Sequence, residues 1–340
     1  MVRVSLKVME KRKRILTGDT PTGKLHLGHF VGTLENRVKL QTEYDTYILL
    51  ANTHAFAKDA TKPEDIYKNT LEDALDNLAV GLNPEKASLV LESLIPEIFE
   101  LYTYFGMLAS HNRVLRNPTV KEEIVYKKLG EHVSFGFVGY PILQAADILS
   151  LKADLVPVGQ DQVPHLEQTR EIARRFNELY GETFPVPEAL VGRVARLPGT
   201  DGKAKMSKSL GNVIYLSDPA ETVKHKVMMM YTDPTRARAT DPGHVEGNPV
   251  FIYHDAFNPD KNEVADLKER YLKGKVGDIE VKEKLVKALN SFLDPIRSRR
   301  LGYEKNPGKV IEIIRTGTEK ASQLAVSTLA EVREKLKLRL

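Results

Sequence analysis

The chain has no cysteine among its 340 residues, which excludes disulfides, thiolate zinc sites and iron–sulfur clusters. It also has no hydrophobic run as long as a membrane span, and residues 1–14 lack the apolar core of a signal peptide. These absences predict a cytoplasmic protein with no membrane partner. With 41% hydrophobic and 28% charged residues, the composition is that of a globular chain long enough for two domains.

The net charge is only +4, but it is distributed unevenly. Residues 268–340 contain 18 Lys and Arg against 10 Asp and Glu (+8), which leaves 32 against 36 (−4) for the rest. A basic C-terminal quarter could bind a polyanion such as RNA, although a solvated lysine-rich helix surface would give the same pattern. Arg297, Arg299 and Arg300 form a compact cluster there and are candidate RNA contacts.

Strand-like and helix-like patterns alternate over the first 180 residues, and this alternation predicts a parallel sheet covered by helices. The predicted fold class is therefore α/β. A Rossmann-like catalytic domain is expected at 1–215, with a helical insertion at about 95–150, followed by an all-helical domain at 216–340. Strands are predicted at 14–17, 47–51, 89–91 and 155–158, helices at 30–43, 166–179, 281–293 and 310–338, and a loop at 232–248.

The first predicted strand leads into a glycine-containing turn and then into the run H-L-G-H, from His26 to His29. The turn nearly matches a P-loop, but Pro21 removes one backbone donor and Leu25 stands where a magnesium-binding hydroxyl belongs. The two histidines are three positions apart and so share one side of a short helix, where Gly28 leaves room for a ligand. Taken alone, this pair is better explained as a helix cap or a chance surface pair than as a phosphate site.

A second motif, K-M-S-K-S from Lys205 to Ser209, follows some 180 residues later in a glycine-flanked loop at 199–212. Lys205 and Lys208 are three apart and can converge on one anion. In this order the two motifs resemble the HIGH and KMSKS signatures of class I aminoacyl-tRNA synthetases. In such enzymes an amino-acid carboxylate attacks the α-phosphate of ATP, so groups that stabilise phosphate charge are needed and a general base is not.

A third segment, residues 137–149, is mostly apolar, yet Tyr140, Gln144 and Asp147 fall at i, i+4 and i+7 on one helical face. Polar groups on such a helix need partners, so they either satisfy one another or face a ligand. With V-G-Q-D-Q at 158–162, the segment resembles the tryptophanyl-tRNA synthetase family. The likeness covers the predicted catalytic domain and returns more weakly in the C-terminal helices.

The resemblance implies a role for each matching residue. Asp147 would accept the indole N–H, as suits a carboxylate that faces a heterocycle able only to donate. The implied catalytic residues are Lys205, Lys208, His26, His29 and Lys121. The implied ATP-binding residues are Thr20, Thr22, Gly23, Gly28, His29, Gly159, Asp161, Gln162, Arg196, Lys205, Met206, Ser207 and Lys208. The implied tryptophan-binding residues are Leu16, His54, Tyr140, Gln144, Asp147 and Gln162.

The sequence also bears on whether the amino-acid substrate is tryptophan or tyrosine. Gln144 replaces a methionine common in bacterial tryptophanyl enzymes, and the related tyrosyl enzymes have Gln and Asp at this spacing. However, Leu16 stands where those enzymes typically place a tyrosine, and V-G-Q-D-Q replaces their G-G-x-D-Q, so tryptophan is favoured.

The resemblance also implies partners and cofactors. These are ATP with Mg²⁺ and no dedicated protein metal site, tRNA(Trp) bound through a C-terminal anticodon-binding domain, and a homodimer. The alternatives are a tyrosyl-tRNA synthetase, a nucleotidyltransferase, and an RNA-binding paralogue without aminoacylation.

Overall fold

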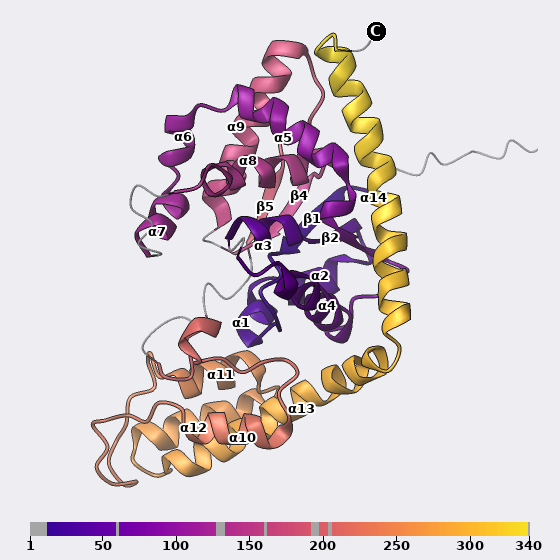
Figure 1. The fold of residues 1–340 in the computed structure, drawn as a ribbon. Helices are drawn as coiled ribbons and strands as arrows, with labels where there is room; N and C mark the ends of the chain where they lie inside the picture. The colour runs from indigo at the N-terminus through magenta and orange to yellow at the C-terminus, as the bar shows by residue number, and fades with distance from the viewer. Residues whose placement is uncertain are drawn as a thin grey trace, which may run out of the picture.

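The computed structural model describes residues 12–58, 61–126, 133–159, 162–191, 197–202 and 206–338 (Figure 1). At its centre is a parallel five-stranded sheet in the order β3-β2-β1-β4-β5, which confirms the predicted α/β class. The strands are β1 (Arg14–Asp19), β2 (Asp45–Leu50), β3 (Ala87–Leu91), β4 (Leu155–Val158) and β5 (Glu188–Val191). The first four were predicted. The short edge strand β5 was not; it has only four residues, and none of them is fully buried.

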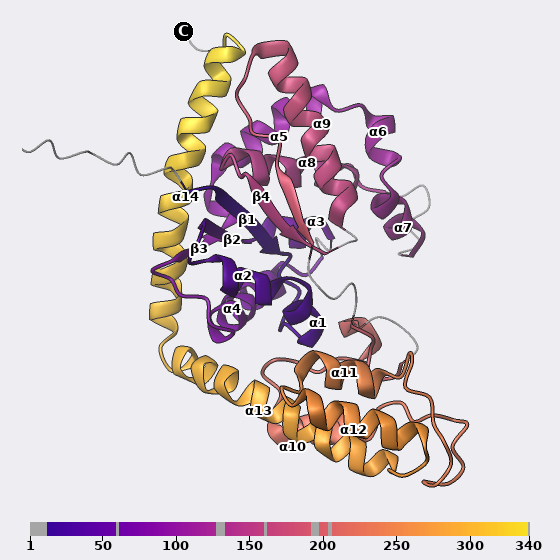
Figure 2. The same cartoon turned by 180° about the vertical axis from the view of Figure 1, so that it is seen from behind.

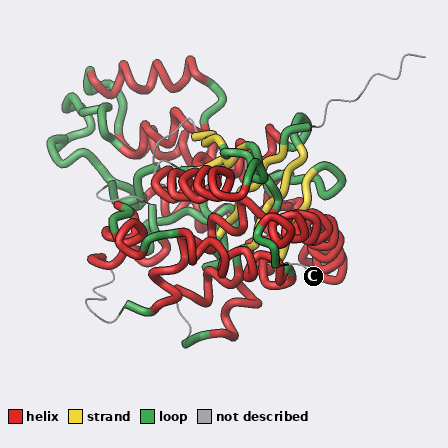
Figure 3. Tube along the Cα trace, turned by 90° about the horizontal axis from the view of Figure 1, so that it is seen from above, coloured by secondary structure: helices red, strands yellow, loops and turns green. Residues whose placement is uncertain are grey.

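Both faces of the sheet are buried, as expected for a parallel sheet with helices on each side. Along β2, Tyr47 and Leu49 belong to one apolar core, while Ile48 and Leu50 belong to another. Seen from above, the strands run between helices (Figure 3). The helical segments before the insertion are α1 (Leu27–His29), the π-helical turn η1 (Phe30–Leu34), α2 (Glu35–Leu40), α3 (Asn52–Lys58), α4 (Pro63–Ala79) and the 3₁₀ turn η2 (Glu92–Leu94).

The stretch between β3 and β4 is helical, as predicted. It comprises α5 (Pro96–Leu108), α6 (His111–Leu115), α7 (Pro118–Tyr126) and α8 (Phe135–Ser150), and α9 (Val163–Tyr180) follows β4. The single helix predicted over 30–43 instead begins as η1, a π-helical turn of the kind that often marks functional sites, and ends with α2 at Leu40. No helix in the described part of the chain combines the length and apolarity that a membrane crossing requires.

The C-terminal third is helical and has two parts (Figures 1 and 2). The helices are α10 (Ala220–Met228), α11 (Pro249–Phe257), α12 (Lys261–Leu272), α13 (Asp278–Glu304) and α14 (Pro307–Lys335). The first part consists of α10–α13, here called the helical body, which lies to one side of the α/β body. The second part is the last helix, α14, which runs back along the sheet.

Helix α14 packs against the edge strand β3 at very short range. A Cβ atom at Gly317 would lie 2.2 Å from the carbonyl oxygen of Leu89, so only glycine allows this approach. One position later, the Thr318 hydroxyl accepts a hydrogen bond of 2.9 Å from the Leu91 amide. Two apolar cores therefore involve α14, although it belongs to the C-terminal third of the chain.

The structure buries one member of the arginine cluster on α13 that was considered as an RNA contact from the sequence. Arg300 is 3% exposed, and its guanidinium pairs with Asp76 and Glu72 of α4. Arg299 donates to the carbonyl of Ala79 (2.6 Å), and Arg297 donates to backbone and side-chain oxygens within the helical body. Arg299 and Arg300 therefore join the helical body to the α/β body, and a contact of Arg297 or Arg299 with RNA stays a prediction.

Candidate active site

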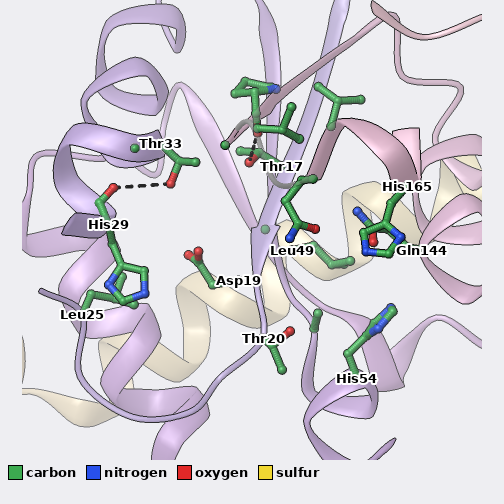
Figure 4. A pocket seen from close by; sticks show the side chains of 18 of the residues that line it. Thr17, Asp19, Thr20, Leu25, His29, Thr33, Leu49, His54, Gln144 and His165 are labelled. Carbon is green, nitrogen blue, oxygen red and sulfur yellow. Dashed lines mark hydrogen bonds between the residues drawn. The ribbon is translucent and has the colours of Figure 1, made fainter. Parts of the chain in front are cut away.

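The site lies at the topological switch point of the sheet. Strand β1 has β2 on one side and β4 on the other, and the loops that leave neighbouring strands in opposite directions open a crevice at their carboxyl ends. A cavity of about 470 Å³ occupies this crevice. Asp19 and His29 line one side of it, and His54, Gln144 and His165 line the other (Figure 4).

Most of the site residues predicted from the sequence surround this cavity. Those that line it are Leu16, Thr20, Thr22, His26, Gly28, His29, His54, Tyr140, Gln144, Asp147, Gly159, Gln162 and Met206. Gly23, Ser207 and Lys208 lie beside it, on the loops that contribute Thr22 and Met206. Lys121 is exposed on α7 and is not among the described lining residues. Asp161, Arg196 and Lys205 lie outside the described residues.

The two motifs that are 180 residues apart in the sequence touch in the structure. The Lys208 ammonium donates to the carbonyl of Gly23 (2.8 Å) and to the hydroxyl of Thr22 (3.2 Å). The Gly28 amide lies 3.3 Å from the sulfur of Met206. A Cβ at Gly28 would lie 3.0 Å from the His26 ring, so any larger residue here would crowd the histidine. The two loops therefore form one continuous wall.

The H-L-G-H run is anchored in the helical body. Leu25 and Leu27 are buried in a core built mainly from residues after 196. Their backbone is paired with the chain after the K-M-S-K-S loop: the Leu27 amide donates to Ile214, and Leu25 accepts from Leu216, both at 3.0 Å. The position of this motif consequently depends on the C-terminal part of the chain.

Both histidines of the motif are neutral near pH 7. Burial lowers the pKa of His26 to about 2, with His29 and Lys208 adding to the shift. Burial also lowers the pKa of His29 to about 4, against the opposing effect of Asp19. The backbone N–H of His26 donates to Nδ1 of His29 (3.1 Å), so the proton of neutral His29 is on Nε2. His29 can therefore donate a hydrogen bond to an anion without carrying charge beforehand.

These lowered pKa values predict acid sensitivity. Below pH 6.5 the imidazoles are protonated in the unfolded chain but stay neutral in the folded chain. The free energy of unfolding is therefore unaffected by these two residues above pH 6.5 and decreases as the pH falls below it. At pH 5 each imidazole costs about 2 kcal/mol. The double variant His26→Gln/His29→Gln should thus lose about 4 kcal/mol less than wild type between pH 7 and pH 5 in urea unfolding. The exposed His111→Gln is the control, and equal losses in all three proteins would contradict the assignment.

Asp19, which lines the same wall, is held by a buried arginine. Arg37 is 1% exposed and forms a bidentate salt bridge with the Asp19 carboxylate, in which Nη2 donates to Oδ1 at 3.0 Å. It also donates to Asn77 of α4 (3.0 Å). Burial is the largest single effect and acts to raise the pKa of Asp19, but the charge and hydrogen bonds of Arg37, together with His29 and Asn77, outweigh it and lower the pKa. The site therefore keeps a fixed carboxylate beside neutral imidazoles.

The opposite wall contains a second buried polar group. Nε2 of His54 lies 3.0 Å from Oδ2 of Asp147, and both side chains are buried. Burial raises the pKa of Asp147 well above its usual range. Its other oxygen, Oδ1, has no hydrogen-bond partner among the described residues. A buried acceptor beside a cavity is suited to a ligand that donates one hydrogen bond.

Tyr140 on this wall is fixed by a relay from the insertion. The amide group of Asn117 donates to Nδ1 of His165 (3.1 Å), which leaves the ring proton on Nε2. That nitrogen lies 3.2 Å from the Tyr140 hydroxyl. Tyr140 was predicted from helical periodicity, whereas no role was assigned to His165 or Asn117.

Asp19 and Glu92 were also missed. Asp19 ends β1 and Glu92 directly follows β3, both at the edge of the sheet where ligands bind, and that position was the available signal.

Comparison with known proteins places this geometry in one family. The family described as tRNA synthetases class I (W and Y) matches residues 9–294. A protein of Clostridium longisporum named tryptophan--tRNA ligase is 50% identical over 325 residues, covering 94% of this chain and 95% of the relative. A protein of the same name from Treponema pallidum is 49% identical over 327 residues, covering 96% and 97%.

Solved structures agree with the sequence matches. The crystal structure of tryptophanyl-tRNA synthetase from Campylobacter jejuni, complexed with ADP and tryptophan, has a TM-score of 0.84 and 33% identity, covering 95% of this chain and 99% of that one. A tyrosyl-tRNA synthetase from Archaeoglobus fulgidus is more distant, with a TM-score of 0.67 and 26% identity. These findings confirm the family resemblance inferred from the motifs.

Proposed function

Because this chain belongs to the class I tRNA synthetases of the tryptophan and tyrosine branch, we propose that its cavity activates tryptophan with ATP and passes it to tRNA(Trp). The relatives named tryptophan--tRNA ligase, about half identical over nearly the whole chain, support tryptophan over tyrosine. The observation that carries the proposal is the division of the cavity. Groups suited to phosphate line one wall, and the other wall has a buried carboxylate, Asp147, whose Oδ1 has no hydrogen-bond partner among the described residues.

ATP would lie along the first wall. Lys208 and the Nε2–H of His29 would bind its phosphates, with Thr20, Thr22, Gly28 and Met206 around them. The tryptophan carboxylate attacks the α-phosphorus, the bond to the bridging oxygen breaks, and pyrophosphate leaves. Fixed donors stabilise the charge that develops on these oxygens without having to reorganise. Lys121, Asp161, Arg196 and Lys205 stay predictions from the resemblance, as does the contact of Gly159 with the adenosine.

Tryptophan would lie against the second wall. Asp147 Oδ1 would accept the indole N–H, Leu16 and Gln144 would border the ring, and Tyr140 and Gln162 would hold the α-amino group. A substrate without the N–H leaves Oδ1 of Asp147 buried and unpaired, which is how such a site rejects it.

Asp147→Ala tests this role. The variant should lower kcat/KM for tryptophan about 10- to 100-fold in ATP–pyrophosphate exchange, since a specific hydrogen bond is lost. Benzothienylalanine, in which sulfur replaces the N–H, should be affected far less. A variant that folds and still activates tryptophan normally would place indole recognition elsewhere. In wild type, exchange with tyrosine as efficient as with tryptophan would overturn the specificity.

Further properties belong to the same proposal. ATP would enter with Mg²⁺, which neutralises phosphate charge. The body formed by α10–α13 would bind the anticodon region of tRNA, whereas α14 packs on the sheet. A homodimer is supported by large apolar side chains exposed on the insertion, where Met107 is 77%, Val125 76% and Phe135 83% exposed. The family and the sequence pattern support the cytoplasm as its location.

A further inference from the structure

Glu92 directly follows β3. It lies behind the cavity wall that contains His54, Tyr140, Gln144 and Asp147, here called the indole wall. Its side chain is completely buried, and it is not among the described residues that line the cavity. Oε2 of its carboxylate accepts hydrogen bonds from the backbone amides of Thr53 (2.9 Å) and His54 (3.4 Å). These amides open helix α3, so Glu92 holds the backbone of the residue that contacts Asp147.

The same carboxylate also approaches the imidazole of His54. Oε1 of Glu92 lies 3.8 Å from Nε2 of His54, which is the nitrogen bonded to Asp147. One ligand atom from each of the three side chains lies within 4.8 Å of the others, and all three residues are buried. His54 is thus held between two acids, one fixing its backbone and the other accepting its side-chain bond.

We propose that Glu92 is a positioning residue for indole recognition: it fixes His54, and His54 holds Asp147 with Oδ1 turned toward the substrate N–H. The terminal torsion of an aspartate is intrinsically broad, so an external partner is needed to fix the carboxylate plane. The inference rests on the proposed role of Asp147 as the indole acceptor. Glu92 itself touches neither the cavity nor the reacting atoms.

The electrostatics agree with this arrangement. Burial, reinforced by the Asp147 charge, raises the pKa of Glu92 to about 8, with His54 and the α3 amides opposing the shift. A neutral Glu92 near pH 7 adds no second negative charge beside Asp147.

The test compares tryptophan with benzothienylalanine in ATP–pyrophosphate exchange. In Glu92→Ala, the ratio of the two kcat/KM values should fall at least about tenfold, while kcat/KM for the analogue stays within about twofold. Glu92→Gln keeps an oxygen that can accept from the Thr53 amide, so its ratio should stay within about threefold of wild type. Equal losses for both substrates in Glu92→Ala would indicate a structural role only and overturn the inference.

Three further variants make each outcome decisive. Asp260→Ala removes a carboxylate that likewise accepts from two amides at a helix start, in α12, and should leave the ratio unchanged. Asp147→Ala distinguishes the proposed function from the role of Glu92. If the ratio of the two kcat/KM values is unchanged in Asp147→Ala, the proposed role of Asp147 is wrong. If the ratio falls in Asp147→Ala but is unchanged in Glu92→Ala, only the inference about Glu92 is wrong. If Glu92→Ala yields no folded protein, Glu92→Asp withdraws the carboxylate by one methylene. A reduced ratio in that variant supports the role of Glu92, and an unaltered one rejects it.

Discussion

Lys208→Ala should slow the formation of tryptophanyl-adenylate about 10²- to 10³-fold, the cost of removing one fixed group that stabilises developing charge. In the structure Lys208 already reaches across to the first motif, with its ammonium 2.8 Å from the carbonyl of Gly23. It is thus held where phosphate oxygens would lie before ATP arrives. Tryptophan affinity should change little, because the indole wall lies on the opposite side of the cavity (Figure 4).

Single-turnover chemistry and substrate binding separate these two effects. Because the chain contains no tryptophan, the fluorescence of the substrate itself reports its binding without a protein tryptophan background. Lys24→Ala is the matched control, since this lysine is exposed on the same glycine-containing turn and is not among the described residues that line the cavity. Adenylate formation at the wild-type rate in Lys208→Ala would reject the phosphate-binding role of this loop.

The sequence was most informative where a local pattern determines the structure. Apolar runs at β1 to β4 predicted buried strands, and three polar residues at helical spacing placed Tyr140, Gln144 and Asp147 on one wall. The two motifs predicted a common phosphate site through resemblance, and the structure brings the described parts of both into contact. These features depend on short stretches of chain or on motif order.

Features that depend on long-range packing were not predictable in this way. A basic cluster on a helix looks the same whether it faces RNA or meets an acid from an element 220 residues earlier. The partner was nevertheless marked in the sequence. Asp73, Asp76 and Asn77 lie on the buried face of α4, and buried polar side chains need partners. Pairing these residues with Arg37 and Arg300 required the tertiary structure.

Arg300→Met should destabilise the protein by about 3–5 kcal/mol, because it leaves Asp76 buried without its cation. Asp76 is 0% exposed, and its two oxygens serve different parts of the molecule. Oδ1 pairs with Arg300 of α13, and Oδ2 accepts from the amide of Leu25 (2.6 Å), directly before His26. Loss of the arginine should therefore loosen both the H-L-G-H run and the junction between the two bodies. Because the H-L-G-H run belongs to the wall proposed for ATP, KM for ATP should rise more than KM for tryptophan.

Urea unfolding of matched variants tests the buried pair. Arg299→Met, which removes an exposed neighbour bonded only to a backbone carbonyl among the described residues, should cost less than about 1.5 kcal/mol. Arg300→Met/Asp76→Asn should recover part of the loss, since asparagine removes the stranded charge and keeps an oxygen for the Leu25 amide.

The same variants decide between a buried link and an RNA contact. Below its unfolding transition, Arg300→Met should bind tRNA with the salt dependence of wild type, because a guanidinium enclosed by Asp76 and Glu72 releases no counterions from phosphate. A flatter salt dependence with unchanged stability would return Arg300 to the RNA-facing surface. Equal stability of Arg300→Met and Arg299→Met would show that the junction does not depend on the buried pair.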